Sequence, residues 1–199
     1  MVENSVKSHL ASKDTLQNLK ENICWIKTID PDKASDELHT AYDMVSAVHG
    51  KIHNLYRTFS LQPAPMESAD IHYREILYND NNELSSWFLE LLATQVAILT
   101  ECQYAYTHHG NAFINLLDNE KRANTILQAI RVGDLDNTEI FTPKETALLQ
   151  FAKKLSIEPD KMKKNDIRLL SETGVTDKEI LEAVQATACF AYWVRFINA

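Results

Sequence analysis

Residues 85–110 read SSWFLELLATQVAILTECQYAYTHHG, and they contain two helix patterns in succession. In its first half, apolar side chains recur at helical spacing as far as Leu99. Thr100 and Gln103 then form a capping-box pattern, which predicts a second helix from Thr100 to about Leu117. We therefore expect an antiparallel helix pair that carries the functional site, with the chain reversing near Thr100.

Helix signals continue along the rest of the chain. Ser35, Thr142 and Thr176 are each an N-cap residue type in front of a helical pattern, and Gly50 and Gly174 suit helix ends. No stretch shows the sustained alternation that is typical of a β-strand. We expect an all-α fold with at least six helices, covering about residues 35–49, 65–77, 86–99, 100–117, 143–155 and 177–197, together with a short helix that contains Ile167 and Leu170 and ends at Gly174.

The chain of 199 residues has a length that suits one domain with a core of its own. Residues 1–22 are largely polar and are expected to form a lead-in, so that the all-α domain covers residues 23–199. This lead-in lacks the apolar centre of a signal peptide. Cysteines occur three times at wide spacing, which is no disulfide framework and favours a reducing cytoplasm.

Composition excludes several classes of partner. The formal net charge is −8, so no basic face is expected for a nucleic acid. No apolar run reaches the roughly 20 residues that a membrane span needs. The four glycines are isolated in the sequence, so no phosphate-binding loop can be assembled, and we expect no nucleotide or other cofactor.

Residues 101–110 contain the side chains that are best suited to catalysis. Cys102 falls in the first turn of the expected second helix, where backbone N–H groups favour a thiolate and should lower the pKa of the thiol. His109 lies seven residues further, about 10 Å along the helix axis. Position 105 is one turn before His109 and within reach of its imidazole, but it is occupied by alanine.

Glu90 is the third candidate, because it interrupts an apolar stretch and a carboxylate there needs a partner. Counted from the reversal, Glu90 and His109 fall at nearly the same level of the helix pair, as proton relay would require. Tyr104 and His108 complete the candidate set as supporting residues. Simpler interpretations stay open: a buried apolar cysteine, histidines at a helix end, and a glutamate paired on the surface.

A metal site is not expected from the same residues. No ligand pair has the spacing of a structural zinc site, and the adjacent side chains of His108 and His109 point about 100° apart on a helix.

Glu90, eleven residues, and then Cys102-x-x-Ala105-x-x-His108-His109-Gly110 resemble the AhpD-like alkylhydroperoxidase superfamily, which includes the carboxymuconolactone decarboxylases. The nearer likeness is to its uncharacterised peroxidase-related branch, whose motif is Cys-x-x-Cys-x-x-His-His-Gly. The likeness extends over about residues 24–197, and its other matching stretches are Trp25-Ile26, Asp30-Pro31, 50–57, 60–63, 84–85, 142–155 and 174–182.

The resemblance implies an all-α homo-oligomer that reduces hydroperoxides with a thiol pair. It implies that Glu90 and His109 take the proton-relay positions and Cys102 the position of the first cysteine. Ala105 stands at the position of the second cysteine, so the two-thiol cycle is not available to this chain.

Three hypotheses remain open. In the first, the chain is a peroxidase-related antioxidant oxidoreductase in which Cys102 acts alone on a small hydroperoxide and an external thiol reduces it again. In the second, His109 and Glu90 perform decarboxylase-like acid–base chemistry on a small organic acid. In the third, the chain is an inactive oligomeric binding or scaffold protein. The sequence leaves the substrate, the electron donor and the number of subunits open.

Overall fold

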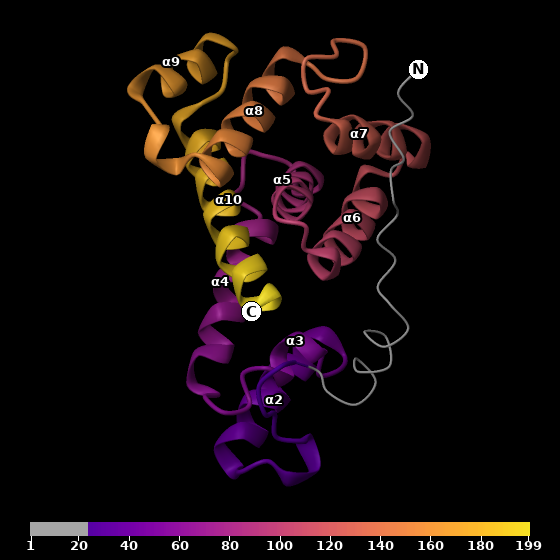
Figure 1. The fold of residues 1–199 in the computed structure, drawn as a ribbon, viewed down its shortest axis with the longest axis vertical. Coiled ribbons are helices and arrows are strands. Elements are labelled where there is room, and N and C mark those ends of the chain that lie inside the picture. The colour runs from indigo at the N-terminus through magenta and orange to yellow at the C-terminus, as the bar shows by residue number, and fades with distance from the viewer. Residues whose placement is uncertain (1–23) are drawn as a thin grey trace, which may run out of the picture. The chain divides into compact units, whose positions relative to one another are not determined.

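The computed structural model describes residues 24–199, so the expected lead-in over residues 1–22 lies outside the described part of the chain. Within residues 24–199 there is no strand, and the all-α prediction is confirmed. The α-helices are α2 (Asp36–His49), α3 (Asn54–Arg57), α4 (Ala64–Tyr78), α5 (Ser86–Leu99), α6 (Gln103–Leu117), α7 (Glu120–Val132), α8 (Pro143–Ile157), α9 (Lys164–Glu172) and α10 (Asp177–Asn198). Two 3₁₀ turns, η1 (Pro31–Lys33) and η2 (Pro159–Lys161), complete the elements (Figure 1).

The chain forms two compact units, which divide inside α4 between Asp70 and Ile71. The division falls within one continuous helix, so it does not by itself separate two domains. The expectation of a single domain over residues 23–199 stays a prediction.

The first unit contains α2, α3 and the start of α4. The Ser35 side chain caps α2 by accepting from the N–H of Leu38 at 3.3 Å, as predicted. Gly50 ends the same helix at φ 73°, in the left-handed region that glycine adopts without strain. The apolar core of this unit is formed by Leu38, Ala41, Tyr42, Val45, Tyr56, Phe59 and Met66.

A polar cluster joins the three helices of the first unit. Asp70 of α4 is 3% exposed and accepts hydrogen bonds from His49 Nε2 at 2.7 Å and from the Tyr56 hydroxyl. The rings of His49 and Tyr56 stack with their centroids 5.3 Å apart. Since α2, α3 and α4 each supply one member, the cluster ties these helices together.

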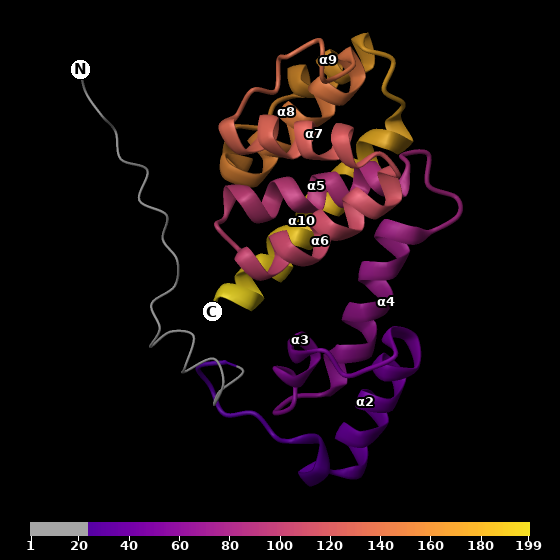
Figure 2. The same cartoon turned by 90° about the vertical axis from the view of Figure 1, so that its right-hand side faces the viewer.

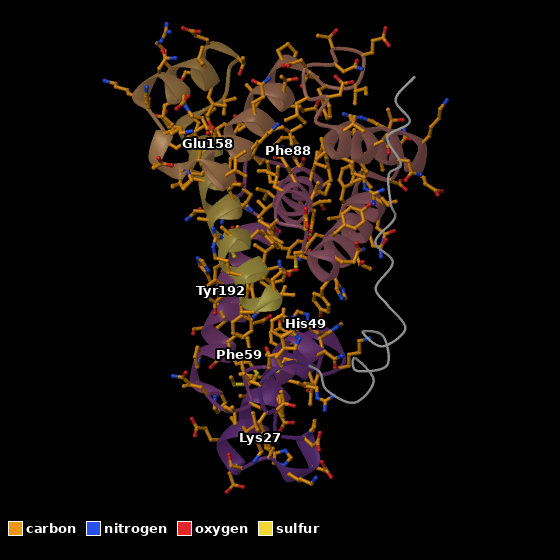
Figure 3. All side chains as sticks on the ribbon, in the orientation of Figure 1. Lys27, His49, Phe59, Phe88, Glu158 and Tyr192 are labelled. Carbon is orange, nitrogen blue, oxygen red and sulfur yellow. The ribbon has the colours of Figure 1, made fainter. Side chains whose placement is uncertain are left out.

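The second unit is built around α5, and Figures 1 and 2 show this helix surrounded by the other helices of the unit. Every residue of α5 from Phe88 to Ala97 is buried, and α5 packs against α6, α8 and α10. Phe88 is 3% exposed among the surrounding side chains (Figure 3). This burial explains why the helix is mostly apolar, with Glu90, Thr94 and Gln95 as its buried polar side chains.

Two of the predicted caps in this unit are confirmed, and one is wrong. Thr142 and Thr176 form full capping boxes with Glu145 and Glu179. Thr100 instead ends α5, where its hydroxyl donates to the carbonyl of Val96 at 2.8 Å.

The actual start of α6 is at Gln103, with Cys102 as the N-cap. The reversal between α5 and α6 is so tight that Glu101 adopts a positive φ of 54° and the N–H of Cys102 bonds back to the carbonyl of Ala97 at 2.9 Å. Thr100 therefore remains part of the preceding turn and is not available to cap the next helix.

Helix α10 is apolar on almost every side near Trp193. Phe190, Trp193 and Val194 are buried, but Tyr192 is 49% exposed (Figure 3), so one side of the helix faces outward. Among the described residues, α10 is the one helix whose length and composition could cross a membrane. Half of its most apolar stretch is buried inside the structure, so this is weak evidence for a span.

Candidate functional site

The site is centred on the carboxylate of Glu90, whose side chain is 0% exposed. One oxygen, Oε2, lies 2.7 Å from Nδ1 of His109. The other, Oε1, accepts a hydrogen bond from the Tyr78 hydroxyl. A buried carboxylate is costly unless both oxygens have donors, and here each oxygen has one.

Three helices supply these side chains. Tyr78 is the last residue of α4, Glu90 lies near the start of α5, and His109 lies in the second turn of α6. The sequence predicted that the helix pair would place Glu90 and His109 at one level, and the structure brings them together. Their catalytic role stays a prediction.

The arrangement decides which nitrogen of His109 carries the proton. Because a carboxylate only accepts hydrogen bonds, Nδ1 of His109 must donate to Glu90. In the neutral ring, Nε2 then has a free lone pair and can accept a proton. We assign this tautomer from the chemistry of the two partners.

Tyr78 is a donor that stays protonated. Burial raises the pKa of Tyr78 far above its ordinary value, and the neighbouring Tyr73 and the negative charge of Glu90 raise it further. The hydroxyl therefore keeps its proton for Glu90 at any pH at which the protein works.

Aromatic side chains surround His109. The ring of Phe190, on α10, meets the imidazole edge to face with centroids 4.5 Å apart. The ring of Tyr73, on α4, lies 6.1 Å from the imidazole and 6.2 Å from Phe190. The His109 side chain is 14% exposed, so part of it is accessible to solvent.

The structure corrects the prediction made for Cys102. The sequence predicted a lowered pKa, but Cys102 is 1% exposed and burial raises the pKa of its thiol. The N–H groups of Ala105 and Tyr104 act in the opposite direction and are outweighed. The position of Cys102 at a helix start was correctly identified, but the loss of water around the thiol decides the direction of its pKa shift.

The two-thiol route is closed, because position 105, one turn before His109, is an alanine and offers no thiol. Ala105 is fully buried. Cys24, Cys102 and Cys189 are all free cysteines. As the N-cap of α6, Cys102 lies seven residues before His109, a rise of about 10 Å along a helix.

The supporting candidates Tyr104 and His108 lie on a different side of α6 from His109. Their rings contact each other, with centroids 4.4 Å apart, and His108 is exposed. The structure does not bring them to Glu90. Within residues 24–199, no group of three histidine, cysteine or acidic side chains is placed to hold a metal ion.

Sequence reasoning missed Tyr78, Tyr73 and Phe190. The demand of a buried Glu90 for a second donor was a usable signal, but nothing in the local sequence identifies Tyr78 as that donor. Tyr73 and Phe190 contact the ring of His109, and all three residues reach the site through the packing of α4 and α10.

No family model matches the sequence, and no curated protein matches it significantly. Solved structures do match. An uncharacterized peroxidase-related protein from Ralstonia eutropha JMP134, described as an alkylhydroperoxidase AhpD core, superposes with a TM-score of 0.73 and 19% identity, over 89% of this chain and 90% of that one. A second uncharacterized peroxidase-related protein, from Silicibacter sp. TM1040, gives a TM-score of 0.67 and 19% identity, over 86% of this chain and 91% of that one.

The debrominase Bmp8, solved as a cysteine-to-alanine variant with 2,3,4-tribromopyrrole, also shares the fold. Its TM-score is 0.67 and its identity 14%, over 87% of each chain. The resemblance to AhpD-like peroxidase-related proteins is thus confirmed at the level of the fold. The debrominase shows that this fold also supports other catalytic roles.

Proposed function

We propose that this chain is an enzyme of the AhpD-like fold that performs general acid–base chemistry on a small, largely apolar organic molecule. His109 transfers the proton, and Glu90 holds and compensates the imidazole. The observation that carries the proposal is the fully buried Glu90 carboxylate, which accepts from Tyr78 through one oxygen and from His109 Nδ1 through the other.

The proposed step is a proton transfer in two directions. Nε2 of His109 takes a proton from a carbon or oxygen acid of the bound molecule and leaves an anion there. The imidazolium that forms lies 2.7 Å from the Glu90 carboxylate, so its positive charge is compensated in a buried environment. The same nitrogen then returns the proton to a different atom of the anion or to its leaving group.

A second candidate is peroxide reduction by Cys102 alone. The thiolate would attack the hydroperoxide, break the O–O bond, release an alcohol and become a sulfenic acid, which an external thiol would reduce. The N–H groups of Tyr104 and Ala105 beside the thiol favour this reaction, whereas burial and the raised pKa of Cys102 oppose it. We therefore rank the antioxidant function after the acid–base function.

Three variants in one activity panel separate the candidates. The panel contains a lactone acid, 2,3,4-tribromopyrrole with a thiol reductant, and an organic hydroperoxide with the same reductant. The variants are His109→Gln, Glu90→Gln and Cys102→Ser, and the matched control is His108→Gln, which changes the adjacent exposed histidine.

Acid–base chemistry predicts that turnover falls at least about 100-fold in His109→Gln, within the usual range for a general acid or base. Turnover should also fall in Glu90→Gln, and it should persist in Cys102→Ser and His108→Gln. Loss of hydroperoxide turnover in Cys102→Ser alone would establish the single-cysteine peroxidase instead. Absence of turnover across a broad panel would favour a binding or scaffold protein.

Homo-oligomerisation and a cytoplasmic location remain part of the proposal. The exposed Tyr192 on α10, beside the buried Trp193, is a natural place to probe association. Light scattering on the wild-type chain and on Tyr192→Glu would report whether this side of α10 holds subunits together.

A further inference from the structure

We infer that Tyr78 is a positioning residue, which acts through Glu90 to fix the nitrogen of His109 that carries the proton. The inference rests on the proposed function of His109 as a base at Nε2. Tyr78 itself touches Glu90 and not the reacting atom.

The geometry divides the two oxygens of Glu90 between two donors. The Tyr78 hydroxyl takes Oε1 and His109 Nδ1 takes Oε2, on a side chain that is 0% exposed. A carboxylate with a donor on each oxygen is stabilised in its ionised form. As long as Glu90 is ionised, Nδ1 must donate and Nε2 is the basic nitrogen.

Removal of the hydroxyl changes this balance. In Tyr78→Phe, Oε1 of Glu90 loses its donor in a place that water does not reach, which favours the neutral acid. When the site takes up one proton from solvent, Glu90 becomes the neutral acid and donates to Nδ1 of His109, and the single ring proton of His109 is then carried by Nε2. The nitrogen that accepted a proton in the wild type becomes a donor, so His109 loses its function as a base without moving.

The substitution leaves the surrounding structure in place. Tyr78 is 42% exposed, and its edge-to-face contact with Tyr73, at 6.1 Å between centroids, needs only the ring. Phenylalanine keeps that ring, so the chain should fold as before and the hydroxyl alone is tested.

Nitrogen-15 NMR of histidine-labelled, full-length protein reads the tautomer directly, because protonated and unprotonated ring nitrogens have well-separated shifts. His109→Gln assigns the resonances of His109 among the seven histidines. We expect Nδ1–H in the wild type and Nε2–H in Tyr78→Phe, with kcat for any substrate found in the panel falling at least tenfold. The matched control is Tyr192→Phe, another half-exposed tyrosine on a helix, which should keep the wild-type spectrum.

Glu90→Gln provides a second reading that does not depend on Tyr78→Phe being well folded. With the Tyr78 hydroxyl donating to the amide oxygen, the amide NH₂ must donate to Nδ1 of His109, so Nε2–H is expected here too. The combined variant Tyr78→Phe with Glu90→Gln frees the amide to turn, and a mixture of tautomers should appear.

The outcomes separate this inference from the proposed function. If Tyr78→Phe keeps the Nδ1–H tautomer, Tyr78 does not position His109, whatever the activity panel shows. If Glu90→Gln keeps that tautomer while Tyr78 is present, the division of the two oxygens is wrong and the inference fails as well. If the tautomer changes as expected but no substrate is ever turned over, the inference stands and the acid–base function fails.

Discussion

His109→Leu should destabilise the protein through the charge that it leaves behind. Leucine fills most of the space of the imidazole but cannot donate to Oε2 of Glu90, which is 0% exposed and would keep a donor only on Oε1. Leaving a buried charged acceptor without one of its donors costs about 3 kcal/mol, because no water replaces the lost hydrogen bond. For a chain of this size, 3 kcal/mol corresponds to a fall in Tm of about 6–12 °C.

Urea unfolding, monitored by circular dichroism, measures this loss, and two further variants identify its origin. His108→Leu removes the adjacent exposed histidine and should change the free energy of unfolding by less than about 0.5 kcal/mol. Adding Glu90→Leu to His109→Leu removes the uncompensated charge, so the double variant should be more stable than His109→Leu alone.

If His109→Leu lowers the free energy of unfolding no more than His108→Leu does at neutral pH, His109 is not a donor on which the buried Glu90 depends.

Three further predictions concern other parts of the chain. Since burial raises the pKa of Cys102, iodoacetamide should alkylate this thiol more slowly than a free thiol at pH 8. Mass spectrometry should show the alkylation rate rising only above the ordinary thiol pKa range, and rapid alkylation at pH 7 would contradict this. Burial also raises the pKa of Cys189, to about 11. Because the unfolded chain then releases this proton at a lower pH, the free energy of unfolding should fall as the pH rises from about 8.5 towards 11. The fall should be smaller in Cys189→Ala, and an equal fall in both proteins would contradict this. Asp70→Asn weakens the hydrogen bonds with His49 and Tyr56 and should lower the free energy of unfolding by about 1–3 kcal/mol. Hydrogen exchange should become faster in α2 and α3, and unchanged exchange would show that the cluster does not tie these helices together.

Restoring a second thiol tests the alignment of the motif with the dithiol proteins. Ala105→Cys places a thiol one turn before His109 and three residues after Cys102. Oxidation should then form a bond between these two thiols, detected by mass spectrometry of the digested protein. Failure to form it under mild oxidation would indicate that Cys102 does not hold the position of the first cysteine.

Much of the fold was predictable because the relevant signals are local. Apolar spacing defines α5, and the capping boxes at Thr142 and Thr176 mark the starts of α8 and α10. The pairing of Glu90 with His109 followed from counting residues on either side of one reversal. Helix α7 was missed although Asn119 caps it and its apolar residues have helical spacing, so that omission was avoidable.

The features that could not be predicted depend on packing between distant segments. The start of α6 depends on a three-residue reversal with Glu101 at positive φ, which no propensity scale favours. The pKa of Cys102 reflects two opposing effects, of which the sequence shows only the N-terminal position in the helix and not the burial. The contact between Tyr78 and Glu90 joins α4 to α5 through side chains whose separation in sequence implies no contact.

The most direct measurement of the central claim is the proton NMR spectrum at low field, where the hydrogen-bonded Nδ1–H of His109 should resonate. We expect a low-field resonance that is protected from solvent exchange, is present in the wild type and in Cys102→Ser, and is absent from His109→Gln. In Glu90→Gln the resonance should disappear, because Nδ1 then accepts from the amide. A wild-type spectrum without it, or one in which it persists in Glu90→Gln, would contradict a buried carboxylate that holds His109 as a base.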